Sequence, residues 1–168
     1  MMDGMKYFVN AWMVNKMAIA IKIKNLNVDL GLIEIGFVGL LRSAEKIVRS
    51  FVKKPFKKEL SIEIFESKKF YDYFKLPEMV LKGDGNYGKV EGLYCIVDKN
   101  TRGVAIVFND NWKKILIHEL TLAVDFDKFS NIRYKIFSKI MKRFRKFRKY
   151  DRYEKRAWKN EKEWKLNV

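Results

Sequence analysis

The sequence has few of the residues that build most catalytic and metal sites. Its 168 residues include one cysteine, Cys95, and one histidine, His118, and glutamine is absent. A single cysteine excludes an internal disulfide framework and a multi-cysteine zinc site. A single histidine excludes most His-rich metal sites and any chemistry that needs paired imidazoles.

Long apolar runs are also missing. The longest one, residues 32–41, contains Glu34 and two glycines. It is about half as long as the roughly 20 residues that a membrane-spanning helix needs. The apolar part of the N-terminal segment is broken by Asn10 and shows no small-residue cleavage site, so we expect no signal peptide. These absences together predict a cytoplasmic protein.

Apolar side chains and positive charge are abundant. Hydrophobic residues make up 48% of the chain and aromatic residues 15%, which excludes general disorder. The combination of many lysines with no glutamine is typical of thermophile proteins, and AT-rich codon usage gives a similar bias. The formal net charge is +16, and residues 131–168 hold 15 basic and 4 acidic residues, a net charge of +11. The sequence therefore predicts a mildly basic globular part followed by a strongly basic tail.

Hydrophobic periodicity predicts the fold class. Alternation of apolar and polar residues predicts strands, and apolar residues at steps of three and four predict helices. The strands expected on this basis are residues 18–24, 28–35, 59–65, 90–97 and 104–108. The expected helices are residues 38–52, 68–74, 112–124 and a basic stretch from residue 131. We therefore expect an α+β protein with a small mixed or antiparallel sheet, a buried helix and a long basic C-terminal helix. The expected divisions are an extension (1–16), the α+β domain (17–130) and a basic aromatic helical tail (131–168).

The expected buried helix contains one motif whose residues are typical of a catalytic metal site. Residues 117–125 read Ile-His-Glu-Leu-Thr-Leu-Ala-Val-Asp. This segment resembles the active-site helix of the zincin metalloproteases, whose signature is H-E-x-x-H. The resemblance implies that His118 is the first zinc ligand and that Glu119 is the general base acting on the metal-bound water. Within the gluzincin branch a later helix supplies a glutamate as third ligand, and Glu154 matches that residue.

The departure from the signature decides the expected function. Leu122 stands where zincins have their second histidine, and it cannot bind metal. We therefore expect an inactivated zincin-like scaffold with no cofactor. The alternative is a metallopeptidase with an altered zinc-ligand set that uses His118, Glu119 and Glu154. Two further alternatives are a core histidine that hydrogen-bonds a neighbour and a nucleophile pair of Cys95 with His118.

The basic tail predicts a partner. Its apolar residues at 132, 136, 140, 144 and 147 follow helical spacing, so residues 131–147 are expected to pack this stripe on the core. The residues expected to bind the phosphates of nucleic acid or another polyanion are Lys142, Arg143, Arg145, Lys146, Arg148, Lys149, Arg152, Lys155 and Arg156. An acidic membrane surface or a protein partner is the alternative, because basic amphipathic helices bind either. Tyr153 and Trp158 are candidates for stacking on bases or for a lipid interface.

Overall fold

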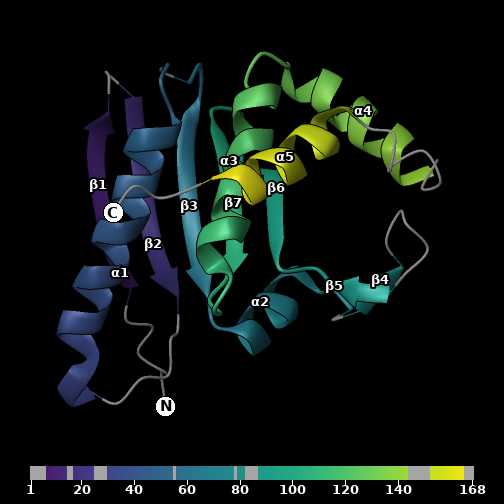
Figure 1. Ribbon diagram of the computed structural model, residues 1–168. Coiled ribbons are helices and arrows are strands. Elements are labelled where there is room, and N and C mark those ends of the chain that lie inside the picture. Colours follow the sequence, from purple (N-terminus) through teal and green to yellow (C-terminus); the bar gives the residue numbers. More distant parts are fainter. Residues whose placement is uncertain are drawn as a thin grey trace.

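A mixed sheet with helices on one face organises the chain (Figure 1). The computed structural model describes residues 7–14, 17–24, 30–54, 56–77, 79–81, 87–143 and 152–164. The strands are β1 (Tyr7–Val14), β2 (Met17–Lys24), β3 (Glu59–Phe65), β4 (Met79–Leu81), β5 (Tyr87–Lys89), β6 (Gly92–Ile96) and β7 (Thr101–Val107). The helices are α1 (Leu30–Phe51), α2 (Ser67–Phe74), α3 (Trp112–Phe126), α4 (Asn131–Arg143) and α5 (Arg152–Glu163). The expected α+β class is confirmed.

Within the described residues the main sheet has five strands in the order β1-β2-β3-β7-β6. β2, β3 and β7 run parallel to one another, and β1 and β6 are antiparallel edge strands. The remaining pair, β4 and β5, forms a separate two-stranded sheet. Residues 7–14, which the sequence assigned to an N-terminal extension, are thus one edge of the sheet.

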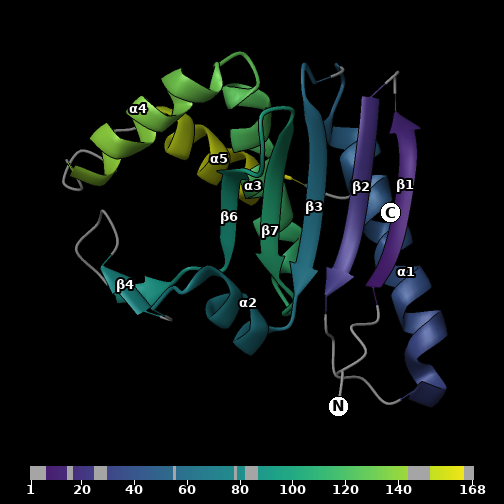
Figure 2. The same ribbon diagram turned by 180° about the vertical axis from the view of Figure 1, so that it is seen from behind.

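Helices α1 and α3 lie on one face of the sheet, and α5 crosses the outer side of α3 (Figure 1). Figure 2 shows the opposite face, where α2 lies beside the ends of β3 and β7. A small cluster around Phe65 and Phe70 fixes α2 there. No described helix is long and apolar enough to span a membrane.

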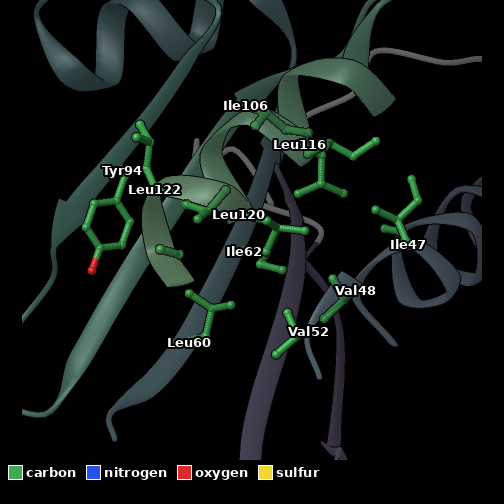
Figure 3. Packing of buried hydrophobic residues seen from close by; sticks show 14 of the residues in the cluster. Ile47, Val48, Val52, Leu60, Ile62, Tyr94, Ile106, Leu116, Leu120 and Leu122 are labelled. Atoms are coloured by element: carbon green, nitrogen blue, oxygen red, sulfur yellow. The ribbon is translucent and has the colours of Figure 1, made fainter. Parts of the chain in front are cut away.

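The main core lies between the sheet and the helices. Along β3, Leu60, Ile62 and Ile64 alternate toward the helices and are at most 2% exposed. Figure 3 shows Leu116 and Leu120 of α3 packed among the side chains of this cluster. The sheet covers one side of α3 and α5 covers the other, which is why its sequence is apolar on most sides.

One expected strand is wrong. Residues 30–35 belong to α1, whereas the sequence predicted a strand over residues 28–35. Apolar residues are so dense there that they fit a period of two and a helical period equally well. Gly31, Gly36 and Gly39 also lower the intrinsic helix propensity of this part of α1. The helical spacing that begins at Val38 extends back through this segment.

The expected C-terminal helix is divided in two. α4 ends at Arg143 and α5 begins at Arg152. The sequence also predicts a break in the helix near residues 150 and 151, which lie outside the described residues. α5 returns across α3, which brings the basic tail back over the buried helix.

Candidate functional site

His118 lies between two carboxylates supplied by α5. Its Nε2 is 3.3 Å from Oε2 of Glu154, and its Nδ1 is 3.1 Å from Oε2 of Glu161. The two glutamates are seven residues apart, so they lie two turns apart on one face of α5. Burial alone would lower the pKa of His118, but hydrogen bonds to Glu154 and Glu161 outweigh it and raise the pKa to about 10. At neutral pH the ring is therefore an imidazolium that donates a hydrogen bond to each carboxylate.

Glu119 is buried beside the edge strand β6. Its side chain is 6% exposed, and its Oε2 has no hydrogen-bond partner among the described residues. Gly92, at the start of β6, lies so close that a Cβ there would approach Oε1 of Glu119 to 2.6 Å. Burial raises the pKa of Glu119 to about 8, although the His118 charge opposes this. Glu119 is therefore mostly protonated at neutral pH and is a weak candidate for a general base.

Leu122, one turn after His118, is 7% exposed and belongs to the main core (Figure 3). A catalytic zinc needs three protein ligands and an open position. His118 of α3 and Glu154 of α5 supply two donors, and Leu122, one turn after His118 on α3, supplies none. In the part of the chain that the structure describes, no group of three or more His, Cys, Asp or Glu residues is arranged to hold a metal ion. The donor set therefore falls short of a catalytic zinc site.

A row of polar contacts continues from His118 along α3. The hydroxyl of Thr121 donates to the carbonyl of Ile117 at 2.9 Å and accepts from the amide of Asn160 at 3.1 Å. One turn further, Nη1 of Arg156 donates to Oδ1 of Asp125 at 2.9 Å. His118, Thr121 and Asp125 follow a spacing of three and four, so all three meet α5. These contacts give His118 a structural role, which is to hold α5 on α3.

Sequence reasoning anticipated the proximity of Glu154 to His118 only through the family resemblance. It missed Glu161, Asn160 and the ion pair of Asp125 with Arg156. The available signal was the polar spacing on α3 together with the seven-residue spacing of the two glutamates. Both patterns mark one helix face, but neither identifies the element opposite.

The alternative pairing of Cys95 with His118 does not match the strand geometry. Tyr94 faces the main core, so its neighbour Cys95 points to the other face of the sheet. There Cys95 lies against Gly103, whose Cβ, if present, would be 2.9 Å from the sulfur. Burial raises the pKa of the Cys95 thiol to about 11, so it remains a thiol at neutral pH. The thiol therefore lies on the opposite face of the sheet from α3 and His118.

The structure divides the expected polyanion-binding residues among different places. Arg145, Lys146, Arg148 and Lys149 lie outside the described residues, and Lys142 and Arg143 form the end of α4.

The other three are exposed on α5, where two of them have structural contacts. Arg156 pairs with Asp125, and Nη2 of Arg152 donates to the hydroxyl of Tyr153 at 2.7 Å. Tyr153 itself is 8% exposed, so it belongs to the core and is not free to stack on a base.

The described part of the apolar stripe that was expected to pack on the core faces outward instead, and Phe144 and Phe147 lie outside the described residues. On α4, Ile132, Ile136 and Ile140 are 72%, 56% and 50% exposed. The residues that pack inward are Tyr134 and Phe137, which join an aromatic cluster with Phe126, Phe129 and Tyr153. α4 thus has two apolar faces, and the face with the larger rings is buried because it removes more apolar surface from water.

Fold and site together define an α+β protein with a structural histidine–carboxylate cluster and an exposed basic helix that also carries isoleucines. Comparison of the chain with protein-family models, with curated proteins and with solved structures gives no match. The functional argument therefore depends on the geometry of the chain itself.

Proposed function

We propose that this chain is a non-enzymatic binding protein for a polyanion, built on an inactivated zincin-like scaffold. The observation that carries the proposal is the charge of the two C-terminal helices. Residues 131–143 and 152–164 contain ten basic and three acidic residues. Two of the three acidic residues, Glu154 and Glu161, are engaged with His118, so the outward charge is almost entirely positive. Such a face attracts phosphate groups with little sequence preference.

The order of the elements supports the scaffold. A helix (α1), a strand (β3), an antiparallel edge pair (β6 and β7) and then the His-Glu helix (α3) occur in the order of small zincin domains, with α2, β4 and β5 inserted between β3 and β6. The later helix α5 brings Glu154 to 3.3 Å from Nε2 of His118, where the resemblance implies the third ligand. This agreement is an analogy of architecture and carries no activity with it.

Loss of catalysis is proposed from three side chains. Leu122 fills the place of the second zinc ligand, His118 is held as a cation between two carboxylates, and Glu119 is mostly protonated. A zinc ligand must be a neutral imidazole and a general base must be ionised. Zinc-dependent hydrolysis would therefore require His118 to lose its proton to the metal and Glu119 to ionise.

One observation favours the second candidate, a metallopeptidase that uses His118, Glu119 and Glu154. Two ligands at roughly 2.0–2.1 Å from one tetrahedral zinc lie about 3.3 Å from each other, and the Nε2–Oε2 distance is 3.3 Å. Metal analysis of the purified protein decides between the candidates. The non-enzymatic proposal predicts far less than one zinc per chain, and stoichiometric zinc that is lost in His118→Ala would overturn it.

Polyanion binding is tested by reversing the charge of α4. The exposed residues Arg133, Lys135 and Lys139 are changed to glutamate, and affinity is measured for a random-sequence DNA duplex and for vesicles containing phosphatidylglycerol. The matched control carries the same change of net charge at three other exposed lysines, Lys54, Lys68 and Lys69.

We expect the α4 variant to lose at least about tenfold more affinity than the control, because its charges lie in the contact. Equal losses in the two variants would mean that only overall charge matters and would overturn the proposed face.

A further inference from the structure

The exposed isoleucines identify a more specific partner for the proposed binding face. The α4 stripe is defined as Ile132, Ile136 and Ile140, which lie at steps of four residues. Over eight residues this stripe is about 12 Å long, at roughly 1.5 Å per residue. Its residues are at least half exposed, so the stripe is a contiguous apolar surface on a strongly charged protein. A charged protein that leaves such a surface uncovered usually uses it for binding.

The α4 stripe is held outward by contacts on the opposite side of the helix. The hydroxyl of Tyr134 donates to the carbonyl of Tyr94 at 3.1 Å, and its ring packs on Phe126. The guanidinium of Arg102 donates to the carbonyl of Phe129 at 3.0 Å and lies 5.4 Å from the centre of the Tyr134 ring. These contacts fix the rotation of α4 about its own axis. The stripe is therefore presented without any need for the helix to turn or unfold.

Basic residues flank the α4 stripe on both sides. With about 100° between successive residues, Arg133 lies about 60° to one side of the middle of the stripe and Lys139 about 60° to the other. Lys135 lies beyond Lys139, and all three side chains are exposed. α4 contains no acidic residue. This apolar stripe between two rows of basic residues matches a partner whose interior is apolar and whose surface layer is anionic.

We infer that α4 docks in the plane of an anionic lipid membrane, with the α4 stripe among the acyl chains and the flanking basic groups at the lipid phosphates. This inference rests on the proposed function and names its partner. Amphipathic helices with basic borders bind membranes in this way, because the long basic side chains reach the headgroups while apolar residues insert.

Other occupants fit the face less well. Nucleic acid provides phosphates that the basic residues can bind, but its backbone has no apolar layer in which three isoleucines could be buried. A second copy would bring two helices without acidic residues together, and their charges would repel. An acidic amphipathic protein segment is the remaining competitor, and the test includes it.

The test separates insertion from charge attraction. Ile132→Asn combined with Ile136→Asn is compared with Met79→Asn combined with Val97→Asn, which changes two exposed apolar residues outside α4. Binding is measured by co-sedimentation with phosphatidylcholine vesicles, with and without about 30% phosphatidylglycerol. The same proteins are titrated with random-sequence DNA duplex and with polyglutamate.

We expect the isoleucine variant to bind anionic vesicles about 25-fold more weakly, since each half-inserted isoleucine accounts for a factor of roughly five. Its affinity for the duplex and its thermal unfolding midpoint should stay unchanged, and the control should match the wild type throughout. Unchanged vesicle binding by the isoleucine variant, or equal binding to neutral vesicles, would overturn the inference.

The remaining outcomes distinguish this inference from the proposed function. Wild-type binding to duplex but not to anionic vesicles would overturn the lipid assignment and leave polyanion binding intact. Binding to polyglutamate without binding to anionic vesicles would assign the face to an acidic protein segment instead. Failure to bind the vesicles, the duplex and polyglutamate at low salt would overturn both proposals.

Discussion

Raising the pH is expected to destabilise the fold through His118. The pKa of this residue is about 10 in the native protein, against an ordinary value of 6.5, because hydrogen bonds to Glu154 and Glu161 outweigh the effect of burial. A group whose pKa is raised on folding stabilises the native state fully below its unfolded pKa. The contribution of the imidazolium is therefore complete below pH 6.5 and is lost as the pH rises toward 10.

The magnitude follows from the two pKa values. Their difference sets an upper bound of about 5 kcal/mol, at about 1.4 kcal/mol for each unit. The side chains of Glu154 and Glu161 are 29% and 34% exposed, so solvent weakens both ion pairs. We therefore expect a contribution of about 2 to 3 kcal/mol to the free energy of unfolding.

Glu119 acts in the same direction over a lower range of pH. Burial raises its pKa to about 8 from 4.5, so the native state keeps a proton that the unfolded chain releases. Stability should therefore fall between pH 4.5 and pH 8, and Glu119→Gln should remove this part of the loss because the amide does not titrate. The loss above pH 8 should remain in Glu119→Gln, since it belongs to His118.

The assay is urea unfolding at about pH 5, 7 and 9 for the wild type, Glu119→Gln and His118→Asn. Comparison of each variant with the wild type at the same pH cancels the general effect of the large positive charge. The stability difference between wild type and His118→Asn should be largest at the lowest pH and should shrink steadily as the pH rises. A difference that stays constant over this range would refute the reasoning, because it would mean that His118 is neutral in the native protein.

Three substitutions test other parts of the structure. Leu122→His creates two histidines one turn apart and should produce stoichiometric zinc binding, which the additional change His118→Ala should abolish. Absence of zinc from Leu122→His in a metal analysis would count against the zincin-like scaffold. Gly92→Ala should cost about 1 to 3 kcal/mol in urea unfolding, because the new Cβ would meet Oε1 of Glu119 at 2.6 Å; an unchanged midpoint would contradict that packing. Arg102→Met should lower the free energy of unfolding by less than about 2 kcal/mol, because the lost contacts with Phe129 and Tyr134 are offset by removal of the buried Nε and Nη1, which have no partner among the described residues. A larger loss in urea unfolding would show that the contacts of Arg102 outweigh the cost of its burial.

Periodicity predicted the elements whose apolar residues follow one period over their whole length. Residues 59–65 alternate cleanly and form β3, and residues 112–124 are apolar on most sides and form the buried α3. Residues 30–35 are apolar on too many sides for a period to be assigned, and they form part of α1.

The burial of α4 was not predictable from its own sequence. Its isoleucines and its aromatic residues both follow helical spacing. The choice between these two faces depends on Phe126 of α3 and Tyr153 of α5, which complete the aromatic cluster. The sequence of one helix does not specify which other elements it packs against.

The candidate site was predictable only in part for a similar reason. The choice of His118, Glu119 and Glu154 came from a family resemblance, and the structure places Oε2 of Glu154 3.3 Å from Nε2 of His118. The second carboxylate at His118, from Glu161, depends on the angle at which α5 crosses α3. That angle is set by packing across many residues, including the contact of Trp164 with Phe51.

The salt dependence of binding tests the central claim most directly. The affinity of the intact chain for a random-sequence duplex should fall steeply with salt, and the slope of log affinity against log salt should become shallower by about 2 to 3 when Arg133, Lys135 and Lys139 are all changed to glutamate. Binding that is independent of salt, or a slope that these three changes leave unaltered, would contradict the account of α4 as a polyanion-binding face.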